Sequence, residues 1–293
     1  MDLALIKTFI EVAEAGSFVS AADKLFVTQS AVSLRVQRLE SQLGRPLFTR
    51  SSTGAELTPA GKEFEGFAQV LLRNWRQACQ QVAIPEGYSR SLTIGAQVSL
   101  WPRMGFRWID GLRQAMPDLS LKAELGLPDS LTRSMTEGVM QISLTYRPSL
   151  RPGLSVEKLL EDELVLVAPF ETHRTEDIKG RYAFVDWGPE FLQFHASHLA
   201  KFTNPGLTLD IGSLAARFVL ERDYAAYLPA RFVKRYTDSG MMHMVPDAPS
   251  FHYPAWSVWR DDLDEDLALV ANQTLVSVVA KAESDTQDVI DLI

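Results

Sequence analysis

Residues 17–50 constrain the fold of this chain more than any other stretch, because their pattern is typical of two short helices joined by a tight turn. Thr28 is a good N-cap for the second helix, since its hydroxyl can accept a hydrogen bond from a backbone N–H of the next turn. Apolar residues then recur at steps of three and four as far as Leu43, and Gly44 can adopt the left-handed conformation that ends a helix. The pattern predicts a helix over 29–43 with one buried stripe.

The opposite face of this predicted helix carries polar side chains of the kind that pair with base edges and phosphates. They are Gln29, Ser30, Ser33, Arg35, Gln37 and Arg38. A loop over 45–57 follows the helix and could form a wing. An ordinary helical hairpin with a solvated polar face would show the same spacing, so the spacing by itself leaves a DNA-binding and a purely structural interpretation open.

The order of residues in the first part of the chain resembles the winged helix-turn-helix signature of the LysR-type transcriptional regulators. The matching positions are Phe9, Ala13, 16–18, Ala21, Ala22, Leu25, 28–33, Leu39, Glu40, Leu43, Gly44, 46–48, Arg50 and 57–61. The resemblance implies that residues 1–58 form an all-α winged helix-turn-helix domain that binds double-stranded DNA. It also implies a sequence-specific regulator of transcription, with RNA polymerase as a further candidate partner.

Within this predicted domain, residues at the start of the second helix should reach furthest into the major groove. The candidates for contacts to base edges are Gln29, Ser30, Ser33 and Arg35, and those for contacts to phosphates are Thr28, Arg38, Thr49, Arg50 and Thr58. A glutamine can bind adenine, and an arginine guanine, each for about 1–3 kcal/mol of discrimination. Family members often carry arginine at the position of Leu34, so here Arg35, or contact of Leu34 with a thymine methyl, would replace that interaction.

A long helix is predicted from Pro59 to about Val82, within a linker region of residues 59–84. Its apolar residues follow a heptad repeat, which favours pairing with a second helix over exposure to water. They are Phe64, Ala68, Leu71, Trp75, Ala78 and Val82. The same seam could pack on the chain's own domain, but in the family this linker helix dimerises. The resemblance therefore implies a homodimer, a homotetramer built as a dimer of dimers, and an interrupted palindrome as the DNA site.

Residues 85–90 predict a hinge, and beyond them strands alternate with helices in a pattern typical of mostly parallel sheets covered on both faces. The resemblance implies that 91–293 form a two-lobed α/β effector-binding domain similar to periplasmic solute-binding proteins. Lobe I would comprise 91–161 and 264–293, and lobe II 162–260, with the tail over 283–293 loosely held. The segment 185–190 resembles a subgroup that includes flagellar-operon regulators of the HdfR kind.

A small-molecule effector would bind in the cleft between the lobes, where strand ends and helix N-termini offer convergent donors. The residues that match the family's effector pocket are Gln97, Val98, Ser99, Leu100, Tyr146, Arg147, Trp187, Ile211, Gly212 and Ser213. Arg147 favours an anionic effector, although an exposed arginine without a ligand is an equal alternative. Ser99 could be only a helix cap and Trp187 only a core residue. Pro128 stands where many relatives offer a backbone N–H, so one donor is absent.

Composition places the chain among the soluble globular proteins, and we expect it in the cytoplasm. Of its 293 residues 46% are apolar and 23% charged, and no apolar run approaches the length of a membrane helix. Lys7 and Glu11 interrupt the apolar N-terminus, which therefore does not resemble a signal peptide. The net charge is −8, but residues 1–62 hold seven Lys or Arg against six Asp or Glu, which leaves a locally basic face for phosphates. The single Cys79 excludes an intramolecular disulfide.

No catalytic cluster, Gly-rich phosphate loop or nucleophile elbow occurs in the sequence, which disfavours an enzyme on the same two-lobed fold. His195 and His198 lie three residues apart on one predicted helix, but two ligands without nearby cysteines fall short of a metal site, and we expect no cofactor. A solute-binding transport component would need an export signal. A repressor that responds to no ligand stays open as an alternative.

Overall fold

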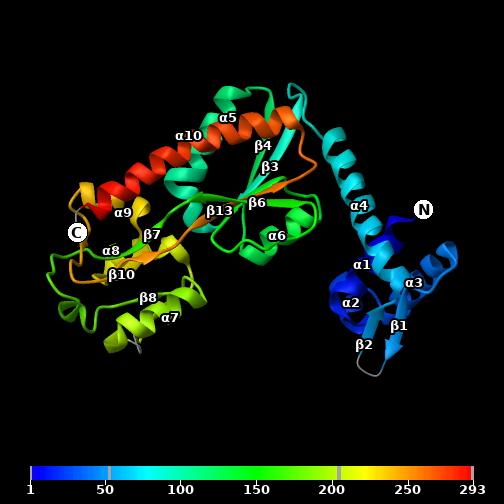
Figure 1. Ribbon diagram of the computed structural model, residues 1–293, viewed down its shortest axis with the longest axis horizontal. Coiled ribbons are helices and arrows are strands. Elements are labelled where there is room, and N and C mark those ends of the chain that lie inside the picture. The colour runs from blue at the N-terminus through cyan, green and yellow to red at the C-terminus, as the bar shows by residue number, and fades with distance from the viewer. Residues whose placement is uncertain (1, 52–53, 203–205, 292–293) are drawn as a thin grey trace. The chain divides into compact units, whose positions relative to one another are not determined.

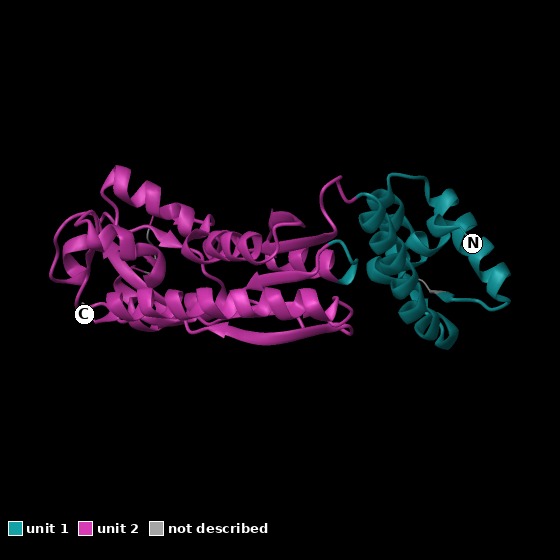
Figure 2. Ribbon diagram, turned by 90° about the horizontal axis from the view of Figure 1, so that it is seen from above, with its two compact units in different colours: residues 1–83, 136–139 teal, residues 84–135, 140–293 magenta. Residues whose placement is uncertain are grey.

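A computed structural model of the chain describes residues 2–51, 54–202 and 206–291, without the side chains of Arg50 and Ser51. The chain forms two compact units (Figure 2), one of residues 1–83 with 136–139 and one of residues 84–135 with 140–293. Each unit contains its own hydrophobic core. No helix among the described residues is both long and apolar enough to span a bilayer.

The first unit begins with three helices packed around Phe9, whose side chain is fully buried. They are α1 (Leu3–Ala15), α2 (Phe18–Leu25) and α3 (Gln29–Leu43), labelled in Figure 1. The Thr28 hydroxyl accepts a hydrogen bond from the Ala31 N–H at 3.2 Å, and Gly44 ends α3 with a φ angle of 68°. The predicted bounds of α3, which rest on these two caps, are confirmed.

A β-hairpin follows α3 and forms the predicted wing. Its strands β1 (Phe48–Ser51) and β2 (Gly54–Leu57) pair antiparallel. The Glu40 carboxylate of α3 accepts hydrogen bonds from the Leu47 and Phe48 N–H groups, at 2.7 and 3.2 Å. The Phe48 ring also packs 5.3 Å from the ring of Phe9. These contacts attach the hairpin to the helices, so the prediction of a winged helix-turn-helix fold is confirmed. The expectation that this domain is all-α is wrong, because its wing is a two-stranded sheet.

The long helix α4 (Pro59–Val82) has the predicted bounds, with Thr58 as its N-cap. Its first half joins the core of the first unit, where Ala68 and Leu72 are buried. Its second half leaves apolar side chains in solvent, since Trp75 is 55% and Val82 89% exposed. An apolar surface on a single helix gains stability only when another surface covers it.

The second unit consists of two lobes, and lobe I is built on a five-stranded sheet in the order β4, β3, β5, β13, β6. The strands are β3 (Arg90–Ala96), β4 (Leu119–Leu125), β5 (Ile142–Thr145), β6 (Leu154–Leu160) and β13 (Ala255–Arg260). Strand β3 runs parallel to β4 and β5, whereas β13 runs antiparallel to β5 and β6. Helices α5 (Phe106–Ala115) and α6 (Pro128–Thr136) connect strands of this sheet.

Lobe II is built on β7 (Glu163–Ala168), with which three later strands pair antiparallel. They are β10 (Ala226–Pro229), β11 (His243–Met244) and β12 (Phe251–His252). A separate parallel pair joins β8 (Phe184–Val185) to β9 (Thr208–Leu209). Helices α7 (Pro189–His198), α8 (Ala215–Arg222) and α9 (Ala230–Asp238) complete the lobe. The prediction of a two-lobed α/β domain is confirmed.

Two details of this domain differ from the sequence-based expectation. The sheets are not mostly parallel, because the chain crosses between the lobes in both directions and strands such as β13 return antiparallel. The second crossing lies near Pro254 rather than near Arg260, since β13 pairs with β5 and β6 of lobe I. Alternating apolar runs indicate where strands occur, but they do not indicate which sheet each strand joins.

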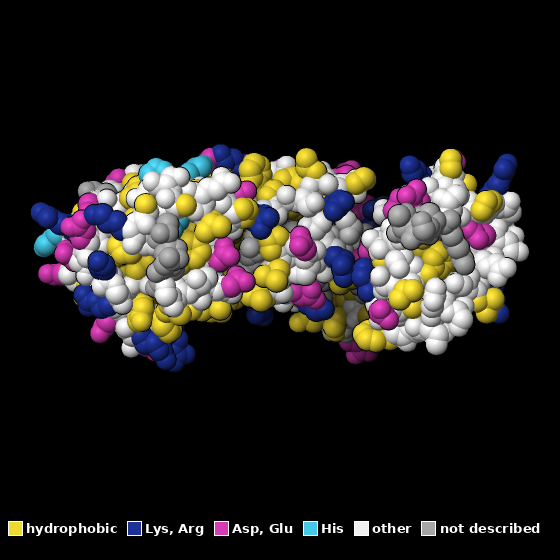
Figure 3. Space-filling model, turned by 90° about the horizontal axis from the view of Figure 1, so that it is seen from below, with side chains coloured by type: hydrophobic (Ala, Val, Ile, Leu, Met, Phe, Trp, Pro, Cys, Tyr) yellow, Lys and Arg dark blue, Asp and Glu magenta, His cyan; other side chains and the backbone are white. Residues whose placement is uncertain are grey.

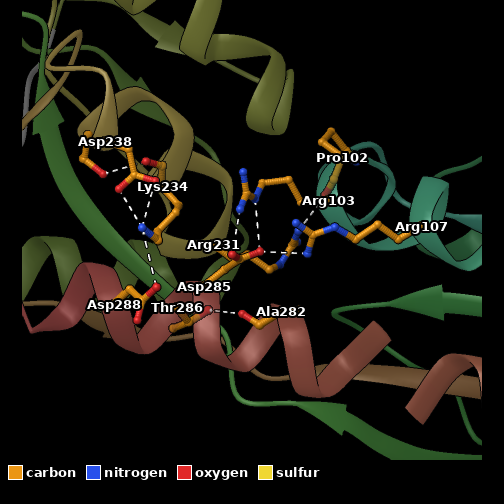
Figure 4. A network of polar contacts seen from close by, with 11 residues as sticks. Pro102, Arg103, Arg107, Arg231, Lys234, Asp238, Ala282, Asp285, Thr286 and Asp288 are labelled. Carbon is orange, nitrogen blue, oxygen red and sulfur yellow. Dashed lines mark hydrogen bonds and ion pairs between the residues drawn. The ribbon is translucent and has the colours of Figure 1, made fainter. Parts of the chain in front are cut away.

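The last helix, α10 (Glu265–Ile290), contacts both lobes. In its first half the Ala271 carbonyl accepts a hydrogen bond from the indole N–H of Trp108, on α5 of lobe I, at 3.0 Å. In its second half Asp288 lies 3.5 Å from the Lys234 ammonium, on α9 of lobe II (Figure 4). The helix therefore extends across the junction of the two lobes.

The C-terminal part of α10 is packed, which makes the expectation of a loosely held tail wrong for residues 283–291. Thr286 and Val289 are buried, and Asp285 accepts hydrogen bonds from Arg103 at 2.7 Å and from Arg107 at 2.8 Å (Figure 4). Burial by itself would raise the pKa of Asp285, but the hydrogen bonds from the two arginines lower it below its usual value. The acidic composition of the tail suggested that it is exposed, because the sequence does not show that Arg103 and Arg107 lie next to it.

His195 lies in an aromatic cluster inside lobe II and is only 3% exposed. Its ring stacks on Tyr182 at 5.5 Å and meets the Phe184 ring edge-on at 4.9 Å. Among the described residues no partner lies within hydrogen-bond reach of its Nε2 atom. Burial lowers the pKa of His195, because the charged ring would lose its hydration without gaining a partner.

We predict that the chain loses stability as the pH falls below about 6.5, the usual pKa of histidine in an unfolded chain. Above that pH His195 is neutral in both states. Below it the unfolded state binds a proton that the native state, with its lower pKa, does not bind, so stability falls until the pH reaches the native pKa. His195→Phe should flatten this part of the profile of Tm against pH. His173→Gln, at an exposed histidine, should leave the profile unchanged, and an equal effect of both substitutions would contradict the assignment.

Candidate functional site

The exposed face of α3 is centred on Leu34 and is narrower than the sequence suggests. Its exposed side chains follow one another at steps of three and four, and they are Ser30, Leu34, Gln37, Arg38 and Ser41. Ser33 is half-buried, and Arg35 is turned toward α1, where its guanidinium donates to the Thr8 hydroxyl at 3.4 Å. The structure therefore brings Ser30, Leu34 and Arg38 to one face and directs Arg35 away from its centre, whereas Gln29 is exposed in the first turn on another side of the helix.

Gln37 lies on this face but was not among the expected base contacts, and Leu34 was considered there only as an alternative to Arg35. Both are exposed, and both follow Ser30 at helical steps, four residues and then three. Their spacing from Ser30 is the signal that identifies them. The prediction favoured Arg35 over its neighbour Leu34 because the arginine side chain is polar. An apolar side chain such as Leu34 can contact a thymine methyl, and Gln37 can pair with adenine.

Two of the predicted phosphate contacts already use their hydroxyl protons within the protein. The Thr58 hydroxyl accepts from the Gly61 N–H at 3.0 Å and donates to the Pro46 carbonyl at 2.8 Å. The Thr49 hydroxyl donates across the hairpin to the Glu56 carbonyl at 3.2 Å. A hydroxyl carries one proton, so neither can donate to a phosphate without giving up these bonds.

The other predicted phosphate contacts differ in what the structure describes of them. Thr28 caps α3, and its oxygen lies 3.0 Å from the Ser30 hydroxyl oxygen. Arg38 is exposed. The backbone of Arg50 lies in β1, but its side chain lies outside the described part of the structure. Arg38 is thus a described cation on the exposed face of α3.

The predicted dimerisation seam of α4 divides into two groups. Ala68 is buried and Phe64 and Leu71 are partly buried against the core of the first unit. The remaining residues, Trp75, Ala78 and Val82, are exposed. Phe67, which the heptad assignment leaves out, is 64% exposed and lies on the same side as this second group, by the rotation of about 100° per residue. The exposed apolar stripe therefore extends from Phe67 to Val82, and the first three residues of the predicted seam pack within the unit instead.

A cleft of about 970 Å³ lies between the two lobes of the second unit. Eight of the ten residues matched to the family's effector pocket line it, namely Gln97, Val98, Ser99, Tyr146, Arg147, Trp187, Ile211 and Gly212. Leu100 is buried in the core, and Ser213 is buried with its N–H directed at Ser99. Clefts of this size, with polar groups among apolar ones, are typical of small-molecule sites.

Several polar groups at the inner end of the cleft are bonded to the protein itself. The Ser99 hydroxyl of lobe I accepts a hydrogen bond from the Ser213 N–H of lobe II at 2.9 Å. The Gln97 side-chain oxygen accepts from the Thr145 hydroxyl at 2.8 Å and from the Tyr146 N–H at 2.7 Å. These groups join the lobes or brace the wall, so a ligand would have to displace them to use them.

Gly212 makes the approach of the two lobes possible. Its φ angle is 53°, and a Cβ atom added there would lie 2.7 Å from the Ser99 hydroxyl oxygen. A residue with a side chain would therefore be strained and would also push Ser99 away from Ser213.

A fully buried ion pair joins the lobes beneath the cleft. Arg231, in the first turn of α9, donates from Nε to Asp162 at 2.8 Å, and neither side chain is accessible to solvent. Its other nitrogens donate to the Ser99 carbonyl at 2.6 Å, the Pro102 carbonyl at 3.0 Å and the Tyr146 hydroxyl at 2.8 Å. The Tyr146 hydroxyl in turn donates to Asp162 at 2.9 Å. Asp162 lies at the first crossing between the lobes, so these bonds connect lobe II, lobe I and the crossing strand.

The charges of this network are stabilised by each other. Burial works against the charged form of Arg231, but Asp162 and Tyr146 outweigh it and raise the pKa of the guanidinium. Burial raises the pKa of the Tyr146 hydroxyl well above its usual value, and the hydroxyl therefore stays protonated. Neither Arg231 nor Asp162 was among the predicted site residues, although a charged residue two positions after Pro229, where β10 ends, was a usable signal.

The two histidines considered as metal ligands have separate surroundings. His195 is buried among aromatic rings, whereas the His198 Nδ1 lies 3.0 Å from the Phe194 carbonyl oxygen at the surface. No group of three or more His, Cys, Asp or Glu among the described residues is placed to hold a metal ion. His195 thus belongs to the packing of lobe II, and His198 to the end of α7.

Comparison with protein families identifies the chain. Residues 3–62 match the family described as "Bacterial regulatory helix-turn-helix protein, lysR family", and residues 85–273 match the "LysR substrate binding domain". The chain belongs to the LysR family of transcriptional regulators. It is 32% identical over 275 residues to the HTH-type transcriptional regulator HdfR of Yersinia pestis (strain Pestoides F), covering 90% of this chain and 92% of the relative. This regulator combines a helix-turn-helix DNA-binding domain with an effector-binding domain, and its relatives are regulators rather than enzymes.

Solved structures of similar fold include full-length LysR-type proteins. LysG of Corynebacterium glutamicum, determined with bound effector Arg, has a TM-score of 0.56 at 16% identity, and the match covers 96% of this chain and 99% of that one. ArgP of Mycobacterium tuberculosis has a TM-score of 0.54 at 21% identity, with coverage of 96% and 98%. At these identities the likeness concerns the fold.

We predict that Arg231→Met lowers the free energy of unfolding of the second unit by about 3–5 kcal/mol, because Asp162 is left buried without its counter-charge. The double variant Asp162→Asn with Arg231→Met should regain a large part of this loss, since it removes both charges. Urea unfolding followed by tryptophan fluorescence measures the difference. Arg235→Met, at an exposed position of the same helix, is the control and should change stability by less than about 1 kcal/mol. Additive losses in the double variant would contradict the pairing.

Proposed function

We propose that this regulator binds an interrupted palindrome as a homodimer and that a small molecule in the inter-lobe cleft modulates its activity. The exposed polar face of α3, held by caps at both ends, is the observation that carries the proposal. Two such helices related by a two-fold axis would reach two half-sites of DNA. Acting on DNA in the cytoplasm, the bound protein would help or hinder RNA polymerase, which is its expected further partner.

Gln29 and Ser30 support base contact, because they occupy the first turn of α3 and are exposed. Leu34 and Gln37 continue the face of Ser30 by one and two turns. We assign Arg38 and Arg50 to phosphates, since long cations beside a recognition helix fix its register without selecting a sequence. Ser33 lies at the edge of this face, and Arg35 supports α1 and contributes less to base selection than the sequence suggests.

The exposed apolar stripe of α4 supports dimerisation. Phe67, Trp75 and Val82 present apolar surface that an isolated helix would leave in water. Pairing with the α4 of a second copy would bury these side chains in the manner of a coiled coil. Further association of two dimers into a tetramer would place four recognition helices on one DNA segment.

The buried network supports a route from the cleft to the lobes. Tyr146 lines the cleft, and its hydroxyl bonds to both Asp162 and Arg231. A ligand that shifts Tyr146 would change the bonds that hold Arg231 against the lobe I carbonyls. Effector binding would thereby favour a different angle between the lobes, and the two angles would favour different arrangements of the dimer.

We predict that Gln29→Ala changes the base preference of the operator by about 1–3 kcal/mol at one position of each half-site. Arg50→Ala should weaken all sites alike and reduce the salt dependence of binding, because a phosphate contact carries no sequence information. Selection of binding sites from random DNA, followed by titrations at two salt concentrations, distinguishes the two. Gln42→Ala, exposed at the far end of α3, should change neither quantity. The reverse pattern would contradict these roles.

We predict that Trp75→Glu weakens the homodimer at least tenfold, because it places a charge in the apolar stripe of α4. Sedimentation velocity over a concentration series measures the change in dimer dissociation. Gln69→Glu adds the same charge two residues from Phe67, on the other side of the helix, and should leave the dimer intact. A dimer that persists in Trp75→Glu at all concentrations would place the interface elsewhere.

A further inference from the structure

Two carboxylates lie side by side where the lobe II wall of the cleft ends. Strands β8 and β9 are parallel neighbours with Val185 opposite Leu209, and the Asp186 N–H donates to the Leu209 carbonyl at 3.0 Å. Asp186 and Asp210 are therefore the next residues of both strands at the same register, and neighbouring strands lie about 4.8 Å apart. Both residues line the cleft, and no Lys or Arg side chain that the structure describes forms an ion pair with either. One oxygen of Asp186 accepts a hydrogen bond from the Gly188 N–H at 2.8 Å, so its other oxygen would meet the ligand.

Apolar side chains surround these carboxylates. Leu192 and Leu214 of lobe II are 55% and 61% exposed, and Leu125 and Leu127 of lobe I are 68% and 74% exposed. All four line the cleft. Figure 3 shows acidic and hydrophobic side chains next to one another on one face of the larger unit. Exposed leucines gathered in a concave site indicate a ligand with a substantial hydrocarbon part.

The charge of the lining disfavours an anion. Arg147 is the cation that lines the cleft, against the carboxylates Asp129, Asp186 and Asp210. The inner donors that could hold a carboxylate are used within the protein, since the Ser213 N–H is bonded to Ser99. An anionic ligand would thus meet one guanidinium and three like charges, whereas a cationic ligand would meet more opposite than like charges.

We infer that the effector of this regulator is a hydrophobic organic amine, which replaces the anionic effector suggested by Arg147. Its ammonium group is held by Asp186 and Asp210 at the ends of β8 and β9. Its hydrocarbon part covers the leucines that line the two lobes. Trp187 lines the cleft directly after Asp186, but it is only 5% exposed and its indole N–H donates to the Tyr227 carbonyl at 3.0 Å, so it belongs to the wall of the site. This inference rests on the proposed effector cleft and specifies the chemical class that the cleft accepts.

Three probes with one skeleton test the inference, namely 4-phenylbutylamine, 4-phenylbutan-1-ol and 4-phenylbutyrate. Isothermal titration calorimetry with the full-length protein at low ionic strength should give affinities in the order amine, alcohol, carboxylate. The amine should bind roughly tenfold more tightly than the carboxylate. Asp210→Asn should remove most of this preference. Asp223→Asn takes away the same charge at an exposed position outside the cleft lining and should leave the preference intact.

Three results would overturn the inference. They are tighter or equal binding of the carboxylate, equal effects of Asp210→Asn and Asp223→Asn, and the absence of binding by all three probes. Because calorimetry is performed without DNA, these results are separate from a failure of the proposed regulation. That failure would appear as operator affinity that saturating amine leaves unchanged, although the amine binds with the expected preference.

Discussion

The Arg231 guanidinium and the Asp162 carboxylate are both removed from solvent, and the arrangement of the second unit depends on this pair. Desolvating either charge costs several kcal/mol, so each is tolerated only because the other lies 2.8 Å away and further polar partners complete its hydrogen bonds. The partners come from both lobes and from the crossing between them. The angle of the lobes, the position of Tyr146 and the path of the crossing strand are consequently determined together.

The two ends of the cleft above this pair differ in what their polar groups contact. At its inner end the polar groups serve the protein, as Ser99 does when it accepts the Ser213 N–H. At its outer end exposed leucines lie beside Asp186 and Asp210, which pair with no described Lys or Arg, so this end is available to a ligand. The DNA-binding unit follows a different principle, because α3 is positioned by its own caps, by Glu40 and by the buried Phe9 rather than by buried charge.

The sequence predicts most reliably what local interactions determine. The bounds of α3 and α4 follow from Thr28, Gly44 and Thr58, whose effects extend over one helical turn. The direction of Arg35 could not be predicted, because it depends on Thr8 in another helix. Similarly, the pairing of β13 with lobe I and the burial of Asp285 depend on partners more than a hundred residues away. In each case the residue type indicated the kind of interaction correctly. Contacts with distant parts of the chain determined which partner the residue meets.

The distance between the lobes tests most directly whether the buried pair holds them at one angle. Nitroxide labels on Asp110→Cys in α5 and Gln193→Cys in α7, with Cys79 replaced by Ser, report this distance by double electron–electron resonance. The account predicts one narrow distribution for the otherwise unaltered protein and a broad or displaced distribution when Arg231→Met is added. A distribution that Arg231→Met leaves unchanged would contradict it, because other contacts would then fix the lobes.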